Sequence, residues 1–152
     1  MRRIRKLTDG EKDFKNVVDF VVQNFVPEHD MGVLSASNLN LEKGMKWVLF
    51  NIREAVFVVE DDGKLIGTIG LNKTSPWYSD AEYLTDGWFY VLPQYRKKGV
   101  AGILIEAAKD YAKEKSLPLI VGVFSKEDAL GKAGIMNKLG LITVGGLFAT
   151  GV

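Results

Sequence analysis

The chain has 152 residues, of which 47% are hydrophobic and 26% charged, and its formal net charge is +1. This size and composition are typical of a globular protein, so we expect residues 1–152 to form a single domain, and the near-neutral charge argues against a nucleic-acid-binding module. The chain has no cysteine and one histidine, which excludes disulfides, thiolate chemistry and a histidine-based metal cluster, so no metal site is expected. No apolar run approaches the roughly 18 residues that span a bilayer, and the basic start lacks the apolar stretch of a signal peptide; a cytoplasmic location is therefore expected.

The first third of the chain predicts one strand followed by two helices. Residues 2–7 alternate in the manner of an edge strand. Thr8 and Glu11 then fit a capping box, and the apolar residues behind them recur at helical spacing. Residues 27–40 are rich in turn-forming residues and predict a loop, and a second amphipathic helix is expected over 41–52.

The middle of the chain predicts three consecutive strands. The apolar runs 55–60 and 65–72 flank an Asp62-Gly63 turn, which is a strong hairpin signal. A loop rich in breakers follows, and a third long strand is expected over 81–92.

The last third predicts a helix that ends before Pro118, then a short buried strand over 119–124, a glycine-interrupted helix over 126–140 and a final strand or hairpin over 141–152. A helix between two neighbouring strands implies one parallel crossover in an otherwise antiparallel sheet. The expected fold class is therefore α/β (α+β), with a mixed, mostly antiparallel sheet of six to seven strands and about four helices on both faces.

The entrance of the helix before Pro118 combines two features that weaken a helix start. Arg96, Lys97 and Lys98 place positive charge at the positive end of the helix dipole, and Gly99 and Gly102 have low helix propensity. A bound anion would offset both costs, because a helix N-terminus presents unpaired N–H groups and glycine lets a phosphate approach the backbone closely. The pattern therefore predicts a phosphate-binding turn, although neither G-x-x-x-x-G-K-[ST] nor G-x-G-x-x-G is present.

The run Arg96-x-x-Gly99-x-Ala101, just after "VLP", resembles the coenzyme A signature of the GCN5-related N-acetyltransferase (GNAT) family, Gln/Arg-x-x-Gly-x-Gly/Ala. The longer run "VLPQYRKKG" is similar to the family's V-x-P-x-x-R-x-x-G, and "NKLGL" is similar to its EKLGF. The expected order of elements also matches that fold. The resemblance implies an N-acetyltransferase that transfers an acetyl group from acetyl-CoA, its co-substrate, to a primary amine of an unidentified acceptor.

The resemblance also implies how coenzyme A would bind. The backbone amides of residues 96–102 would hold the pyrophosphate, and Lys97 or Lys98 could reach the 3′-phosphate. The pantetheine arm would lie between the third long strand and residues 119–124, pairing with main-chain groups near Phe89 and Val91. The implied cofactor-binding residues are Phe89, Val91, Arg96, Lys97, Lys98, Gly99, Val100, Ala101 and Gly102.

Candidates for the general base lie on the third long strand, because acetyl transfer to an amine needs a group that accepts its proton. A period of two places Glu82 and Asp86 on one face of the strand, and Tyr83 and Thr85 on the other. The family often bulges this strand, and a bulge reverses the face downstream, so the sequence leaves open which pair faces the cleft. Asp86 is nearer the expected thioester, and the catalytic candidates are Asp86 and Glu82. His29 is a further candidate, in the loop that lines the acceptor side in the family.

The position of the usual general acid is occupied by a methionine. Many family members have a tyrosine four residues before the glycine of KLGF, and counting back from Gly140 leads to Met136. The alternative function is therefore a catalytically silent domain of this fold that binds coenzyme A or a protein partner as a sensor or inhibitor. Residues 28–46 mix both charge signs and do not select between a small-molecule amine and a protein amine as acceptor. A homodimer remains open.

Overall fold

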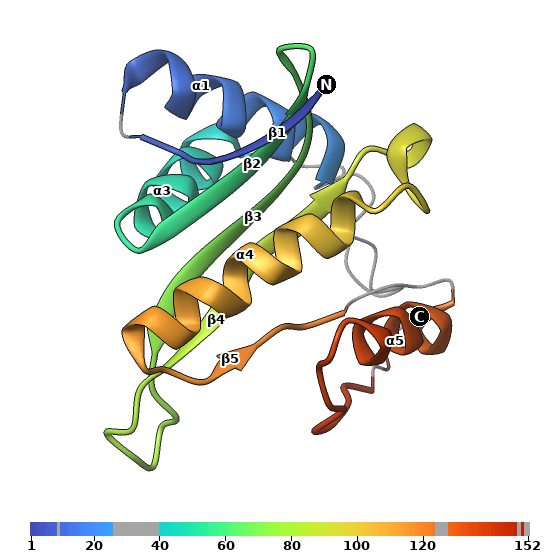
Figure 1. The fold of residues 1–152 in the computed structure, drawn as a ribbon. Helices are drawn as coiled ribbons and strands as arrows, with labels where there is room; N and C mark the ends of the chain where they lie inside the picture. The colour runs from blue at the N-terminus through green and yellow to red at the C-terminus, as the bar shows by residue number, and fades with distance from the viewer. Residues whose placement is uncertain (9, 26–39, 124–127, 149, 151–152) are drawn as a thin grey trace.

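The structure is a computed structural model that describes residues 1–8, 10–25, 40–123, 128–148 and 150. The predicted loop over 27–40, apart from its last residue, and the base candidate His29 lie outside the described residues. In chain order the elements are β1 (Arg2–Lys6), α1 (Glu11–Phe20), the π-helical η1 (Val21–Phe25), α3 (Leu41–Ile52), β2 (Ala55–Asp61), β3 (Lys64–Thr74), β4 (Tyr83–Val91), the 3₁₀-helical η2 (Pro93–Tyr95), α4 (Val100–Lys115), β5 (Leu119–Ile120) and α5 (Ala129–Lys138) (Figure 1).

The strands form one mixed sheet in the order β1-β2-β3-β4-β5. The pairings from β1 to β4 are antiparallel, and β4 pairs with β5 in parallel, which confirms the predicted single crossover. Within the described residues the sheet has five strands instead of the six to seven that were expected. The described residues within 141–152 form no strand, and Gly145 and Gly146, which lack side chains to pack, weaken this stretch as a strand.

Helices cover both faces of the sheet, as predicted. Figure 1 shows α4 across one face and α1 and α3 on the other. Gly67 of β3 allows α4 to approach closely, because a Cβ there would lie 3.0 Å from Val100 and 3.2 Å from Leu104. On the opposite face, Val56 and Val58 of β2 pack in a second buried cluster with α1 and α3. None of the helices in the described part of the chain is long and apolar enough to cross a membrane.

Local signals account for most element boundaries, with one correction. Asp62 and Gly63 both have positive φ, at 49° and 81°, as the predicted two-residue hairpin turn requires. The predicted capping box is wrong: α1 begins at Glu11 with Gly10 as its N-cap and without a capping side chain. The Thr8 hydroxyl instead donates to Asp13 at 2.9 Å, and this carboxylate also binds Arg5 of β1. Asp13 thus draws the hydroxyl away from the helix start and into a contact between α1 and the edge strand.

Candidate active site

The turn that leads into α4 presents several backbone N–H groups at one point. Gly99 is the N-cap, with φ at +85° and no side-chain cap. The first amide of the helical hydrogen-bond ladder is Ile103, which donates to Gly99 O at 3.2 Å. The N–H groups of Val100, Ala101 and Gly102 therefore have no partner within the helix. Together with the helix dipole they make a site suited to an anion, and the helix brings no acidic residue into its first turn.

The glycine at this turn is required by its backbone and leaves space for a ligand. A Cβ at Gly99 would meet nothing within 4 Å, so the position is open, but its left-handed φ strains any other residue. Lys97 is itself left-handed, with φ at 61°. Two positive-φ residues within three positions mark a tightly shaped turn, and such backbone outliers cluster at functional sites.

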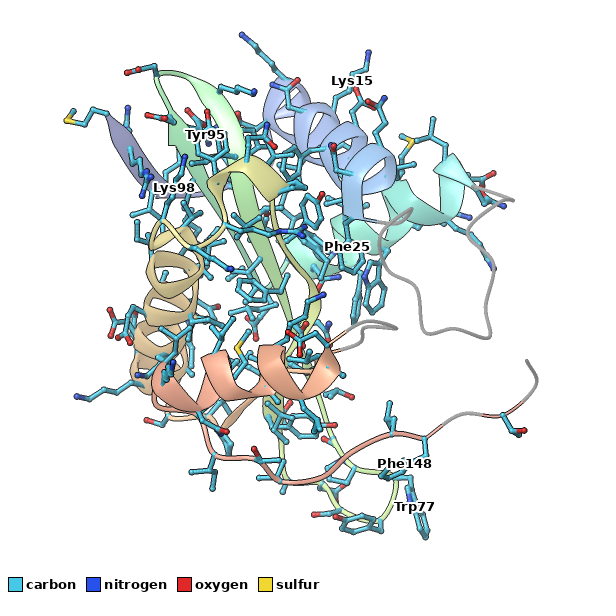
Figure 2. All side chains as sticks on the ribbon, turned by 90° about the vertical axis from the view of Figure 1, so that its right-hand side faces the viewer. Lys15, Phe25, Trp77, Tyr95, Lys98 and Phe148 are labelled. Carbon is cyan, nitrogen blue, oxygen red and sulfur yellow. The ribbon has the colours of Figure 1, made fainter. Side chains whose placement is uncertain are left out.

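The three cations of the motif have different surroundings. Arg96 folds back onto β4, where its Nε donates to Val91 O at 2.9 Å and its guanidinium carbon lies 5.3 Å from the centre of the Tyr90 ring. Lys98 places its Nζ 5.9 Å from the centre of the Tyr95 ring, and Figure 2 shows both side chains beside the start of α4. Lys97 is exposed. Arg96 therefore braces the turn against the sheet, whereas the two lysines remain at its surface.

An edge of β4 leads from the interior of the sheet to this turn. β5 pairs with β4 only at Leu84 and Thr85, and no other strand of the described residues continues that side of β4. Leu92 N–H donates to Ile66 O of β3 at 2.9 Å. Because main-chain groups alternate along a strand, those of Phe89 and Val91 point to the opposite, open edge.

The predicted strand over 119–124 is shorter and less buried than expected. Only Leu119 and Ile120 form β5; Ile120 is 42% exposed and Val121 is half-buried, while Phe124 lies outside the described residues. The strand is short because backbone pairing with β4 ends after these two residues.

A bulge in β4 decides which face Asp86 occupies. Trp88 pairs with Gly70 and Asp86 pairs with Leu71, so Gly87 is the extra residue on β4. Gly67 of β3 faces α4, and Leu71, four residues further along the same strand, shares that face. Directly paired residues also share a face of the sheet. Asp86 therefore faces the α4 side, whereas Trp88 faces α3.

Asp86 lies where β4 and β5 separate. Its Oδ1 accepts a hydrogen bond from Gly122 N–H at 2.9 Å, two residues beyond β5. Burial raises the pKa of its carboxyl to about 6, although the amides of Gly122 and of Asp86 itself act in the opposite direction. The group is thus largely ionised at neutral pH while being more basic than an exposed aspartate, which suits a general base.

Glu82 differs from Asp86 in its place on the chain, its exposure and its partner. It precedes the first residue of β4, its side chain is 50% exposed and it pairs with Lys73 at 3.5 Å. Asp86 lies four positions further along the chain, which corresponds to roughly 13 Å in an extended strand. The structure therefore does not bring the two catalytic candidates together.

Met136 lies on α5 and is half-buried against the core cluster that includes the buried residues of α4. The end of this helix contacts α4: Lys109 Nζ donates to Leu139 O at 3.2 Å, and a Cβ at Gly102 would lie 3.5 Å from Leu139. A thioether donates no proton, so Met136 offers no general acid. Among the described residues there is also no group of three or more His, Cys, Asp or Glu side chains that could hold a metal ion.

Sequence reasoning missed a polar cluster beside the bulge. Asn51 of α3 is 0% exposed and Asn72 of β3 is 5% exposed, and each directly follows an apolar residue of its element. Trp47 of α3 donates its indole N–H to Gly87 O at 3.1 Å. The available signal was an asparagine in each of two apolar segments, but their separation in sequence gave no reason to pair them.

The GNAT acetyltransferase family model matches residues 25–130. This is more than half of the chain, which therefore belongs to the GNAT family. A curated relative, an uncharacterized N-acetyltransferase of Archaeoglobus fulgidus, is 32% identical over 74 residues, covering 47% of this chain and 49% of the relative. The match thus spans about half the length of each protein.

Solved structures of acetyltransferases share the fold over almost the whole chain. A predicted acetyltransferase from Clostridium acetobutylicum, solved with acetyl-CoA, superposes with a TM-score of 0.70 and 18% identity over 99% of this chain and 96% of its own. An aminoglycoside acetyltransferase from an uncultured soil metagenomic sample, in complex with sisomicin, has a TM-score of 0.67 and 20% identity over 98% and 95% of the two chains. At these identities the likeness shows the fold alone.

Proposed function

We propose that this protein is an acetyl-CoA-dependent N-acetyltransferase acting on a primary amine, with residues 1–152 forming one domain. One observation carries the proposal. The open edge of β4 joins a helix start with unpaired amides at one end to a half-buried carboxylate, Asp86, whose pKa is about 6, near the other. Such an edge offers main-chain hydrogen bonds to an extended arm between a phosphate site and a base.

Coenzyme A fits the residues present. The amides of Val100, Ala101 and Gly102 would hold the pyrophosphate, and the open space at Gly99 would let it approach. Lys97 or Lys98 would take the 3′-phosphate. Arg96 would act through its hydrogen bond to Val91 O, which fixes the turn relative to β4.

The same edge would hold the pantetheine arm. The outward main-chain groups of Phe89 would pair with it as a strand pairs with its neighbour. Val91 would contribute its N–H group, because its carbonyl already accepts a hydrogen bond from Arg96. This arrangement directs the thioester toward the part of β4 that carries the bulge and Asp86.

Acetyl-CoA would supply an activated acyl group as a thioester. The amine nitrogen would attack its carbonyl carbon, forming the C–N bond as the C–S bond breaks, and the thiolate would leave. Asp86 would accept the proton released by the nitrogen, and a backbone N–H on the open edge of β4 would stabilise the developing oxyanion. The thiolate would leave without a side-chain acid at Met136.

The acceptor is a small-molecule amine or a protein amine. The aminoglycoside acetyltransferase of the same fold was solved with sisomicin, which makes polyamino sugars reasonable first substrates to test. Simple alkyl amines, aromatic amines and lysine peptides complete the panel, because nothing in the described residues selects among them.

Release of coenzyme A thiol from acetyl-CoA across this amine panel tests the proposal. Asp86→Asn, which retains an oxygen acceptor for Gly122, should lower the rate by roughly 10²–10⁴-fold at neutral pH. Glu82→Gln is the matched control and should stay within about threefold of the wild type. If Asp86→Asn lowers the rate by less than about threefold, solvent or another group accepts the proton of the amine, and Asp86 is not the general base.

A second candidate function rests on Met136, which cannot act as an acid. If the wild type binds coenzyme A by calorimetry but releases no thiol above the buffer rate with any amine, the N-acetyltransferase proposal fails. The domain would then bind coenzyme A, or a partner protein, as a sensor or inhibitor.

A further inference from the structure

A buried pair of asparagine side chains joins α3 to the sheet next to the bulge. Asn72 Nδ2 donates to Asn51 Oδ1 at 3.0 Å, and Asn51 Nδ2 donates to Trp47 O at 2.8 Å. Burying amides is costly unless they are hydrogen-bonded, and an apolar pair would fill the same space without that requirement. A buried and satisfied polar network of this kind specifies one arrangement of the core.

The same helix holds the extra residue of the bulge in two ways. Trp47 Nε1 donates to Gly87 O at 3.1 Å. The Asn51 amide covers Gly87 so closely that a Cβ there would lie 2.4 Å from Asn51 Oδ1. Only glycine fits at this point, and its carbonyl is fixed by the indole.

The residue after the bulge is held on the α3 face as well. Trp88 Nε1 donates to Thr68 Oγ1 at 3.2 Å. Its ring lies over Gly70, where a Cβ would come within 2.4 Å of it. The position of Trp88 is therefore set independently of Asp86.

The bulge decides the direction of Asp86 because side chains alternate along a strand. With Trp88 fixed on the α3 face, a β4 without the bulge would turn Asp86 toward α3 and away from Gly122. We propose that Trp47, Asn51 and Asn72 form a bulge lock, which keeps Gly87 as the extra residue and thereby positions Asp86 at the opening between β4 and β5. These are positioning residues, and the catalytic value of the lock rests on the proposed function.

Titration of the Asp86 carboxyl by carbon-13 NMR on the full chain tests the lock without an acceptor amine. In Asn51→Ala and in Trp47→Phe, we expect the pKa of Asp86 to move away from about 6 by about one unit or more, because the carboxyl leaves its site beside Gly122. The Gly122 amide should lose its protection from hydrogen exchange. Trp47→Phe keeps an aromatic ring and removes only the N–H, so it decides the question if Asn51→Ala does not fold.

Matched controls are Trp77→Phe, at a tryptophan that is 96% exposed, and Asn137→Ala, at an exposed asparagine on α5. Neither should move the pKa of Asp86. Folded lock variants that retain the wild-type Asp86 pKa and Gly122 protection would overturn the proposal. A shifted Asp86 pKa in a protein without acetyl transfer would support the lock while refuting the proposed function, so the two failures are distinguishable.

Discussion

Helices α4 and α5 both follow a strand beside the proposed site, but they are held to the molecule differently. Six side chains of α4 are buried: Val100, Leu104, Ile105, Ala108, Tyr111 and Ala112. No residue of α5 is fully buried, and its Leu130 is 90% exposed. Figure 1 shows α4 along the sheet, whereas α5 lies beyond β5.

Because of this difference, we expect the start of α4 to be more rigid than the part of the proposed site at Met136. The proposed anion-binding turn is the start of a helix whose buried residues run from Val100 to Ala112, so its amides are held in place before a ligand arrives. Met136 lies on a helix with few buried apolar contacts, and such elements open at lower free energy than the global transition. We infer that most of the free energy of coenzyme A binding comes from contacts at α4. We also infer that α5 contributes less to the stability of the fold and to the affinity for coenzyme A.

The largest difference between the two helices should appear when a leucine of each is truncated and the free energy of unfolding is measured. Leu104 of α4 is 0% exposed, and Leu104→Ala should lower the free energy of unfolding by roughly 2–5 kcal/mol through lost burial and a cavity. Leu130→Ala on α5 should change it by less than about 0.5 kcal/mol. Urea denaturation measures both, and comparable losses would show that α5 is as firmly packed as α4.

Introducing a negative charge at the start of α4 should have the next largest effect, which is on coenzyme A binding. Gly99→Glu would place a carboxylate near the pyrophosphate and should weaken coenzyme A binding by about 100-fold or more, since like-charge contacts cost several kcal/mol. Gly134→Glu on α5 is the control, because a Cβ there also meets nothing within 4 Å. Gly99→Ala reports the strain of the left-handed φ by itself. Equal affinities of Gly99→Glu and wild type for coenzyme A, measured by calorimetry, would show that the pyrophosphate does not bind at the start of α4.

The stability of the fold should depend on pH through Asp86, whose carboxylate joins β4 to Gly122 in the segment that leads to α5. The pKa of Asp86 is raised from 3.8 to about 6 in the folded chain, so the folded chain binds a proton at this carboxyl more tightly than the unfolded chain does. Stability should therefore fall as pH rises from about 4 to about 6, with a contribution from this group of roughly 2–3 kcal/mol. Urea denaturation of wild type and Asp86→Asn across this interval isolates the effect; a difference between them that stays constant with pH would contradict it.

The smallest effect is expected at Met136. Met136→Phe exchanges one apolar side chain for another on a loosely packed helix, so the acetyl-transfer rate should change by less than about threefold. Met136→Tyr should raise the rate if the hydroxyl reaches the thioester sulfur, because it would protonate the leaving thiolate. Thiol release measures both variants. Loss of most activity in Met136→Phe would show that the methionine shapes the site and that α5 matters more than its packing indicates.

The sequence by itself determined the elements that depend on local spacing. Apolar periodicity located α1, α3 and α4, and the Asp62-Gly63 pair located the hairpin, because each signal lies within a few neighbouring residues. The entrance of α4 was also predictable, since unpaired amides, glycine and positive charge are consecutive in the chain. For the same reason the coenzyme A signature could be recognised before any fold was known.

Only the tertiary structure decided the features that depend on distant partners. The face of Asp86 follows from a bulge held by Asn51 and Asn72, and its raised pKa follows from burial beside Gly122, 36 residues away. The part of the chain that the structure describes forms five strands in place of the six to seven predicted, because an apolar run becomes a strand only where a neighbour pairs with it. Burial, register and pairing are properties of contacts between segments, and a residue pattern within one segment does not contain them.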